Sequence, residues 1–432
     1  MSELALFGGP AAVSLALPKW PIWDDDDRKA LGDTLESGNW WMYAAGEVDE
    51  VGADGGDETP ARSQVEQFER EYAAAHRVKH AIAVTSGSTA LEICARAIGL
   101  KPGDEVITTP YTFIATSTCI LNAGALPVYV DIDPETYNID PAQIEAAITD
   151  RTRAILPVYF AGEFADIEAI SDIASRHGLK IIEDAAQSPG ACLEGDRYAG
   201  SFGDAAIFSF QASKTLNSGE GGVILTNSDD FANKAWGLRH CGRTKESLWY
   251  EHHDLGWNAR MTEFCGALLR TQLQKLSAQN EKRMANVNHF FDRLSEIEGL
   301  VPAQLHPRAT QRSHYLVIMR YDAAAWDGLP RERFLEALSA EGVAAIAGYT
   351  FPSFENPLFA NLDFSSPDSV YMTGRSSPID YGTFEAKCPN AMRACREEAV
   401  WMMHTLFLGE ADLVDQIADA FLKVRKHYRE LL

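Results

Sequence analysis

The amino-acid sequence predicts an α/β protein with two domains, a larger one over residues 1–285 and a smaller C-terminal α/β domain over residues 286–432. Length is the first observation, because 432 residues exceed the roughly 250–300 residues at which a single hydrophobic core stops growing. The second observation is an alternation of short β-branched segments with helical segments, from Val65 to Thr226. This alternation is typical of a mostly parallel central sheet that lies between helices.

The first forty residues contain the acidic run Asp24–Asp27, directly before Arg28. Carboxylates stabilise the free N–H groups of a first helical turn, so this run predicts a helix start. A metal site is the alternative, but four consecutive carboxylates cannot all face one ion. Residues 43–62 are rich in Gly and acids without an apolar period and predict a long surface loop, a kind of segment that is often functional.

The larger domain is expected to hold a row of strands, with a helix over Phe164–His177 where isoleucines recur at helical spacing. The expected strands are Ala81–Thr85, Glu105–Thr109, Pro127–Ile132, Ala154–Val158, Lys180–Asp184, Ala205–Phe210 and Gly222–Thr226. A long helix over Asn280–Glu298 then leaves this domain. The smaller domain is expected to contain a strand over His314–Tyr321, helices over Arg331–Glu341 and Ala411–Leu432, and a Pro/Ser/Gly-rich stretch over Phe351–Gly382.

Composition excludes several classes of function. The chain has 38 Lys and Arg against 62 Asp and Glu, a formal net charge of −24, which repels nucleic acid and anionic lipid. Neither a signal sequence nor an apolar run of the roughly 18 residues that span a bilayer is present. The 7 cysteines form no CxxC pair, which predicts reduced thiols and a cytoplasmic location. The histidines show no HxxxH or HExxH spacing, so no metal is expected.

Polar residues follow several of the expected strands, at the edge of a parallel sheet where ligands bind. Ser86–Thr89 opens a helix with small residues, which suits a phosphate cradle but also a plain helix cap. Asp184 ends an apolar strand, where it could hold a protonated ring nitrogen or simply cap a helix. Lys214 follows another strand and precedes a Gly-rich turn, which suits a Schiff-base nucleophile or a surface lysine.

Taken together, these features favour a cofactor. A phosphate loop, an acid and a lysine at strand ends of one sheet are what pyridoxal 5'-phosphate requires, since its aldehyde needs an amine, its ring N–H a carboxylate and its phosphate a nest. The surrounding stretches resemble the DegT/StrS group of sugar and cyclitol aminotransferases, in the aspartate-aminotransferase superfamily of fold type I. They are TSGSTAL, GDEVITTPYTFIATS, IIEDAAQSPGA, GSFGDAAIFSFQASKTLNSGEGG, GWNARMTEFCGALLRTQL and, more weakly, KCPNAMRACREEAVWMMHTLF.

The resemblance implies a role for each matching residue and makes the larger domain the one that binds the cofactor. Lys214 would form the Schiff base and shuttle protons, and Asp184 would keep the pyridine nitrogen protonated. The other implied contacts are Phe113 stacked on the ring, Gln187 at the ring oxygen, Gly87, Ser88 and Ser209 at the phosphate, Tyr111 at the substrate, and Asn258 at the phosphate of the neighbouring subunit of a homodimer.

The implied reaction moves an amino group from glutamine or glutamate to a keto-cyclitol like scyllo-inosose, or a related ketone, in secondary-metabolite or antibiotic biosynthesis. The alternative acceptor is a nucleotide-linked keto-sugar, whose pyrophosphate needs cations. Segments 43–62 and 351–382, both expected beside the substrate pocket, hold only Arg62 and Arg375, although Arg239, Arg243 and Lys245 could still reach it. A pyridoxamine-dependent dehydratase of the same group would have histidine in place of Lys214, and a regulator without catalysis would not need both Asp184 and Lys214.

Overall fold

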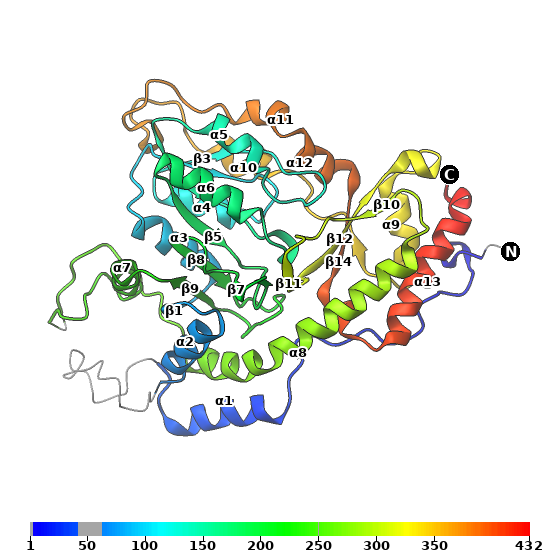
Figure 1. The fold of residues 1–432 in the computed structure, drawn as a ribbon, viewed down its shortest axis with the longest axis horizontal. Helices are drawn as coiled ribbons and strands as arrows, with labels where there is room; N and C mark the ends of the chain where they lie inside the picture. The colour runs from blue at the N-terminus through cyan, green and yellow to red at the C-terminus, as the bar shows by residue number, and fades with distance from the viewer. Residues whose placement is uncertain (1–2, 42–62, 249) are drawn as a thin grey trace.

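A seven-stranded sheet forms the centre of the protein (Figure 1). The structure, a computed structural model, describes residues 3–41, 63–248 and 250–432. Strand order is β1-β9-β8-β5-β4-β2-β3, with β3, β2, β4, β5 and β8 paired in parallel and β9 antiparallel to both neighbours. The predicted mostly parallel sheet is therefore confirmed. Its strands are β1 (His80–Val84), β2 (Glu105–Thr108), β3 (Leu126–Tyr129), β4 (Thr152–Leu156), β5 (Lys180–Asp184), β8 (Ala205–Ser209) and β9 (Gly222–Thr226).

Both faces of the sheet are covered by helices, because alternate side chains of each buried strand point to opposite faces. In β8, Ala206 and Phe208 join one apolar cluster with residues of α2 (Gln64–Ala75), α6 (Ile167–His177) and α8 (Glu263–Leu294). Ala205 and Ile207 join another with residues of α3 (Gly87–Ala97), α4 (Ala115–Asn122) and α7 (Asp229–Arg239). The predicted arrangement of a sheet between helices is confirmed.

The helix predicted over Asn280–Glu298 is only part of a longer one, α8, which spans Glu263–Leu294. It begins at Glu263 because the side chain of Thr262 caps its first turn. Its first half packs in the cluster of the central sheet, through Leu269 and Leu276, and its second half in a separate cluster of the C-terminal part. The predicted domain division at 285/286 falls within α8 and stays a prediction.

The C-terminal part contains an antiparallel sheet, β10-β12-β14-β13, against α9, α8 and α13 (Figure 1). The predicted strand begins at Leu316 rather than His314, whose φ of 46° is not extended, and the last helix ends at His427. The elements here are β10 (Leu300–Pro302), β12 (Leu316–Tyr321), α9 (Arg331–Ala340), β13 (Ala345–Ile346), α10 (Pro357–Asn361), α11 (Phe384–Lys387), α12 (Pro389–Arg393), β14 (Ala399–Met403) and α13 (Ala411–His427).

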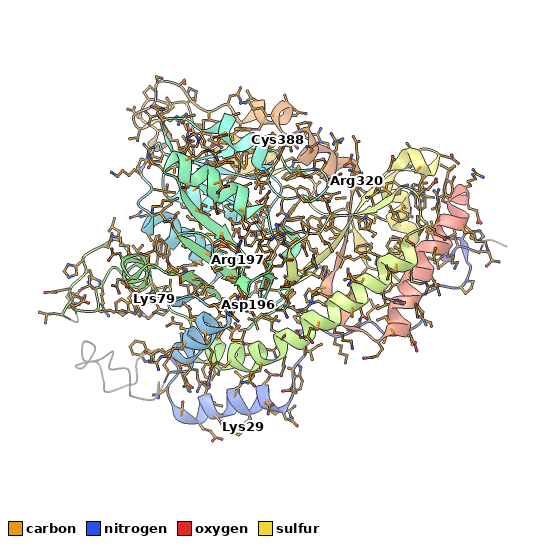
Figure 2. All side chains as sticks on the ribbon, viewed as in Figure 1. Lys29, Lys79, Asp196, Arg197, Arg320 and Cys388 are labelled. Carbon is orange, nitrogen blue, oxygen red and sulfur yellow. The ribbon has the colours of Figure 1, made fainter. Side chains whose placement is uncertain are left out.

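The N-terminal residues connect the two ends of α8. Leu4 packs in the C-terminal cluster, and the chain then runs to α1 (Asp25–Ser37), which lies along the first half of α8 (Figure 1). Asp24 caps α1 as predicted, by accepting hydrogen bonds from Asp26 and Asp27. Lys29 lies on the outer side of this helix, paired with Asp33 at 2.6 Å (Figure 2). None of the helices in the described residues is long and apolar enough to cross a membrane.

Candidate active site

The carboxyl ends of β1, β5 and β8 bring the predicted site residues to one edge of the central sheet. β8 ends at Ser209, and the connection to β9 carries Lys214. This connection contains no crossover helix, and β9 returns antiparallel to β8. The first residue of β9, Gly222, pairs with Val84 at the end of β1 and with Ser209. The loop after β1 therefore lies next to the connection between β8 and β9, which carries Lys214 and is called the lysine loop below.

The first turn of α3 and the end of β8 form a cradle. Ser86 caps the helix by accepting a hydrogen bond from Thr89 N at 3.1 Å, so the amides of Gly87 and Ser88 begin the helix. A Cβ atom on Gly87 would lie 2.7 Å from Cβ of Ser209, and one on Gly222 would overlap the backbone of Ser86. Only glycine allows this approach, which places helix N–H groups beside a hydroxyl, as a phosphate requires.

Asp184 ends β5 and is buried. One carboxylate oxygen accepts a hydrogen bond from Thr116 Oγ1 at 2.9 Å and the other from Ala186 N at 3.2 Å. Thr116 is in turn 3.1 Å from the hydroxyl of Thr112. Burial raises the pKa of Asp184, while these hydrogen bonds and the charge of Lys214 oppose that rise. A buried carboxylate whose pKa is raised by burial favours a cationic partner.

Lys214 lies beside an aromatic ring. Its Nζ is 4.2 Å from the ring centroid of Tyr315, a residue just before β12. The hydroxyl of Tyr315 is 3.1 Å from Oγ of Ser213, which donates to Oε1 of Gln211 at 2.7 Å. The lysine is thus held at the boundary between the central sheet and the C-terminal part, where a bound cofactor would meet both.

The other predicted residues lie in different environments. Gln187 is buried, and its side-chain oxygen accepts a hydrogen bond from Ala161 N at 2.7 Å. Phe113 is 61% exposed, which leaves its ring free to stack. Tyr111 is fully buried and accepts a hydrogen bond from Trp401 Nε1 at 3.1 Å. Asn258 is exposed, on a segment that runs beside the end of β1.

Of the two segments expected beside the substrate pocket, residues 43–62 lie outside the described residues. Residues 351–382 mostly cover the edge strand β3 and the start of its neighbour β2. Tyr381 donates a hydrogen bond to Pro127 O of β3 at 3.1 Å, and Arg375 forms a 2.5 Å ion pair with Glu105 of β2. Only the start of this segment approaches the site, where Ser353 donates a backbone hydrogen bond to Pro110 O at 2.8 Å. Most of the segment therefore protects the sheet edge.

The structure adds residues that the sequence did not indicate as parts of the site: Thr116, Tyr315, Trp20 and His404. The sequence could have indicated Thr116, because it lies four residues after Thr112 and so on the same side of a helical turn. It could not have indicated Tyr315 and His404, because they reach the lysine loop from the C-terminal part through tertiary packing.

Pyridoxal phosphate fits this arrangement. The buried carboxylate of Asp184 matches a protonated ring nitrogen, and the amine of Lys214 is close enough for its charge to act on that carboxylate. Gly87 and Ser209 approach each other so closely that no Cβ atom fits between them, which sets the helix N–H groups beside the Ser209 hydroxyl, as a phosphate requires.

The sequence and the fold are similar to those of known aminotransferases. The sequence profile described as the DegT/DnrJ/EryC1/StrS aminotransferase family matches residues 48–377. A relative from Streptoalloteichus tenebrarius, named putative L-glutamine:3-amino-2,3-dideoxy-scyllo-inosose aminotransferase, is 38% identical over 431 residues, 99% of this chain and 98% of the relative. The crystal structure of 3-amino-5-hydroxybenzoic acid synthase matches with a TM-score of 0.81 and 32% identity, covering 96% of this chain and 99% of that chain. The structure of DesI in the presence of its TDP-sugar product matches with a TM-score of 0.79 and 28% identity, covering 100% and 98%. The chain therefore belongs to the DegT/DnrJ/EryC1/StrS aminotransferase family and is a pyridoxal-phosphate-dependent aminotransferase.

Proposed function

We propose that this aminotransferase moves an amino group from glutamine or glutamate to a keto-cyclitol of the scyllo-inosose type, in the biosynthesis of a secondary metabolite such as an antibiotic. The name of the Streptoalloteichus relative includes both glutamine and an inosose, and the similarity covers nearly all of both chains. Full-length similarity supports a shared class of acceptor, because the segments that surround the site are then matched as well as the cofactor motifs.

The pairing of Arg375 and Arg239 with carboxylates supports the choice of a cyclitol as acceptor. A nucleotide-linked sugar needs cations for its pyrophosphate, whereas a free cyclitol needs none. Within residues 351–382, Arg375 is the one cation, and its side chain, only 10% exposed, forms an ion pair with Glu105. Arg239 is buried, and it pairs with Glu69. Neither side chain is placed to bind a diphosphate.

The site residues then have distinct tasks in the proposed reaction. Pyridoxal phosphate, when bound, supplies a cationic ring that withdraws electrons from the bonds of the carbon beside the amino nitrogen. Lys214 Nζ would hold the cofactor between turnovers and would move a proton to and from that carbon. The carboxylate of Asp184 would accept a hydrogen bond from the ring N–H and so keep the proton on the nitrogen.

The remaining contacts orient the cofactor. Gly87, Ser88 and Ser209 would bind the phosphate, and Phe113 would stack on the ring. Because the side-chain oxygen of Gln187 is engaged by Ala161, its amide nitrogen is the end that would donate to the ring oxygen.

We also propose a homodimer in which Asn258 of one subunit reaches the phosphate site of the other, and a cytoplasmic location. Asn258 is exposed on the single chain, as a residue that serves a neighbouring site would be. All seven cysteines lie in the described residues, and all are free thiols, which suits a reducing compartment.

Single-turnover kinetics test the acceptor. The enzyme, converted to its pyridoxamine form, is mixed with an inosose or with a nucleotide-linked keto-sugar, and the return of the visible absorbance is followed. We expect the inosose to react at least tenfold faster. A faster reaction with the nucleotide-linked sugar would replace the cyclitol with the second candidate acceptor. The observation that supports a nucleotide-linked sugar as the second candidate acceptor is the similarity to DesI, whose structure was determined with a TDP-sugar product.

A further inference from the structure

Two peptide carbonyls immediately before Lys214 are held by side chains from opposite ends of the chain. Nε1 of Trp20 donates a hydrogen bond to Ala212 O at 2.8 Å, and Nε2 of His404 lies 3.0 Å from Ser213 O. Because a carbonyl oxygen only accepts hydrogen bonds, the proton of His404 is on Nε2. Trp20 comes from the segment before α1, and His404 directly follows β14.

The ring of His404 is itself held rigidly. It is fully buried, and the ring of Trp20 contacts it edge-on, with centroids 4.6 Å apart and an interplanar angle of 88°. Its backbone N–H donates to Tyr315 O at 3.2 Å. Burial, together with the positive charges of Arg283 and Lys214, lowers the pKa of His404 to about 3. The imidazole is therefore neutral at physiological pH and acts as a fixed hydrogen-bond donor.

The same loop is tied to the C-terminal part at other points. Thr215 Oγ1 is 2.9 Å from Oγ of Ser313, and the Tyr315 hydroxyl is 3.1 Å from Oγ of Ser213. The peptide units on both sides of Lys214 are thus held by residues distant in sequence. A loop with these restraints presents its lysine in one orientation, and loss of a restraint allows others.

We infer that Trp20 and His404 are positioning residues for Lys214: their N–H groups hold the peptide units before the lysine so that its amine is aimed at the cofactor aldehyde. The inference rests on the proposed role of Lys214. Imine formation joins Nζ to the aldehyde carbon, and the aldehyde oxygen leaves as water. An amine that is not aimed at the aldehyde slows imine formation. It does not weaken phosphate binding, because neither Trp20 nor His404 belongs to the phosphate cradle.

The test compares two cofactor forms on the apoenzyme. Pyridoxamine phosphate binds without an imine, so its dissociation constant reports on the phosphate and ring contacts alone. The rate at which pyridoxal phosphate gains visible absorbance reports on Lys214. For Trp20→Phe, which keeps a ring but loses the N–H, and for His404→Leu, we expect this rate to fall about tenfold with unchanged affinity for pyridoxamine phosphate. His404→Gln, which can still donate, should recover most of the rate.

Trp23→Phe is the matched control, because Trp23 lies on the same segment, is 60% exposed and packs against Arg28; its imine rate should equal that of the wild type. Wild-type rates in both Trp20→Phe and His404→Leu would overturn the inference, as would a parallel loss of rate and pyridoxamine phosphate affinity. If His404→Leu does not fold, Trp20→Phe alone decides. Reductive labelling of the wild type distinguishes a failure of the proposed role of Lys214 from a failure of the positioning role. A label on another lysine refutes the proposed site. A label on Lys214, together with unaffected variants, refutes only the positioning role of Trp20 and His404.

Discussion

Lys214 is the residue on which the proposed chemistry depends. Borohydride should reduce its bond to the cofactor to a stable secondary amine, and peptide mapping should find the pyridoxyl group on Lys214. Lys214→Arg, which keeps the charge but cannot form the imine, should show neither the label nor the visible absorbance band. Recovery of the pyridoxyl group on a different lysine would contradict the assignment.

Thr116 acts on the cofactor through Asp184. Thr116→Val removes the hydroxyl that donates to the carboxylate, so the pKa of Asp184, which burial already raises, should rise further. A carboxylate that is less readily charged holds the ring proton less well. We expect about tenfold weaker binding of pyridoxal phosphate, measured by absorbance titration. Thr116→Ser keeps the hydroxyl and should bind as the wild type does, and equal affinities of the two variants would refute this coupling.

The sequence indicated those members of the candidate site that lie at the end of a strand or in the segment that follows it. Asp184, Lys214 and Gly87 have local signals, because a polar or flexible residue after an apolar strand marks the carboxyl edge of the sheet. Tyr315 and His404 meet the lysine loop only through tertiary packing, and nothing in their sequence neighbourhood specifies that contact.

At the scale of elements, the first turn of α3 depends on the absence of a side chain at Gly87. A Cβ atom there would lie 2.7 Å from Cβ of Ser209, so Gly87→Ala should displace the turn from β8. We expect at least tenfold weaker binding of pyridoxamine phosphate, measured by equilibrium dialysis. Gly32→Ala is the control, since a Cβ atom at this position in α1 meets nothing within 4 Å. Unchanged affinity of Gly87→Ala would argue against the cradle.

The docking of α1 on α8 depends on Asp27. Burial raises its pKa, but hydrogen bonds from Lys275, Thr271 and Gln272 outweigh this effect and hold the pKa at about 2. Because the pKa is lowered from 3.8, the stabilisation is fully present above pH 4 and is lost as the pH falls toward 2. Asp27→Asn should therefore lower the free energy of unfolding by about 2 kcal/mol at pH 7, measured by urea denaturation, and by progressively less on acidification. Asp26→Asn, at an exposed position of the same helix, should change little, and an equal effect of both would contradict the prediction.

The strands were predictable from sequence because buried segments of β-branched residues alternate with helical ones, and β5 and β9 have the predicted bounds. The direction of β9 was not predictable, because no residue pattern within the strand distinguishes parallel from antiparallel pairing with β8. The helix predicted over Asn280–Glu298 lacks the first half of α8, which begins at Glu263 after the capping Thr262.

At the scale of the whole molecule, the single chain leaves apolar side chains exposed. Phe113 is 61% exposed, Leu248 73% and Leu255 78%, and Asn258 follows the latter two in sequence. In the proposed homodimer, Leu248 and Leu255 would be covered by the partner, since burial of exposed apolar surface favours association, while Asn258 reaches the partner's phosphate site.

A shared site links assembly to cofactor binding, since each phosphate cradle would be complete only in the dimer. At a hundredfold excess over its dissociation constant, the cofactor should stabilise the loaded state by about 2.7 kcal/mol per site, so sedimentation at low protein concentration should show more dimer with cofactor than without it. Leu255→Asp places a charge in the proposed interface and should weaken both association and cofactor affinity. Leu35→Asp, at a 57% exposed position of α1, should affect neither. A cofactor-loaded monomer would refute the shared site, because the contact of Asn258 with the phosphate requires a second subunit.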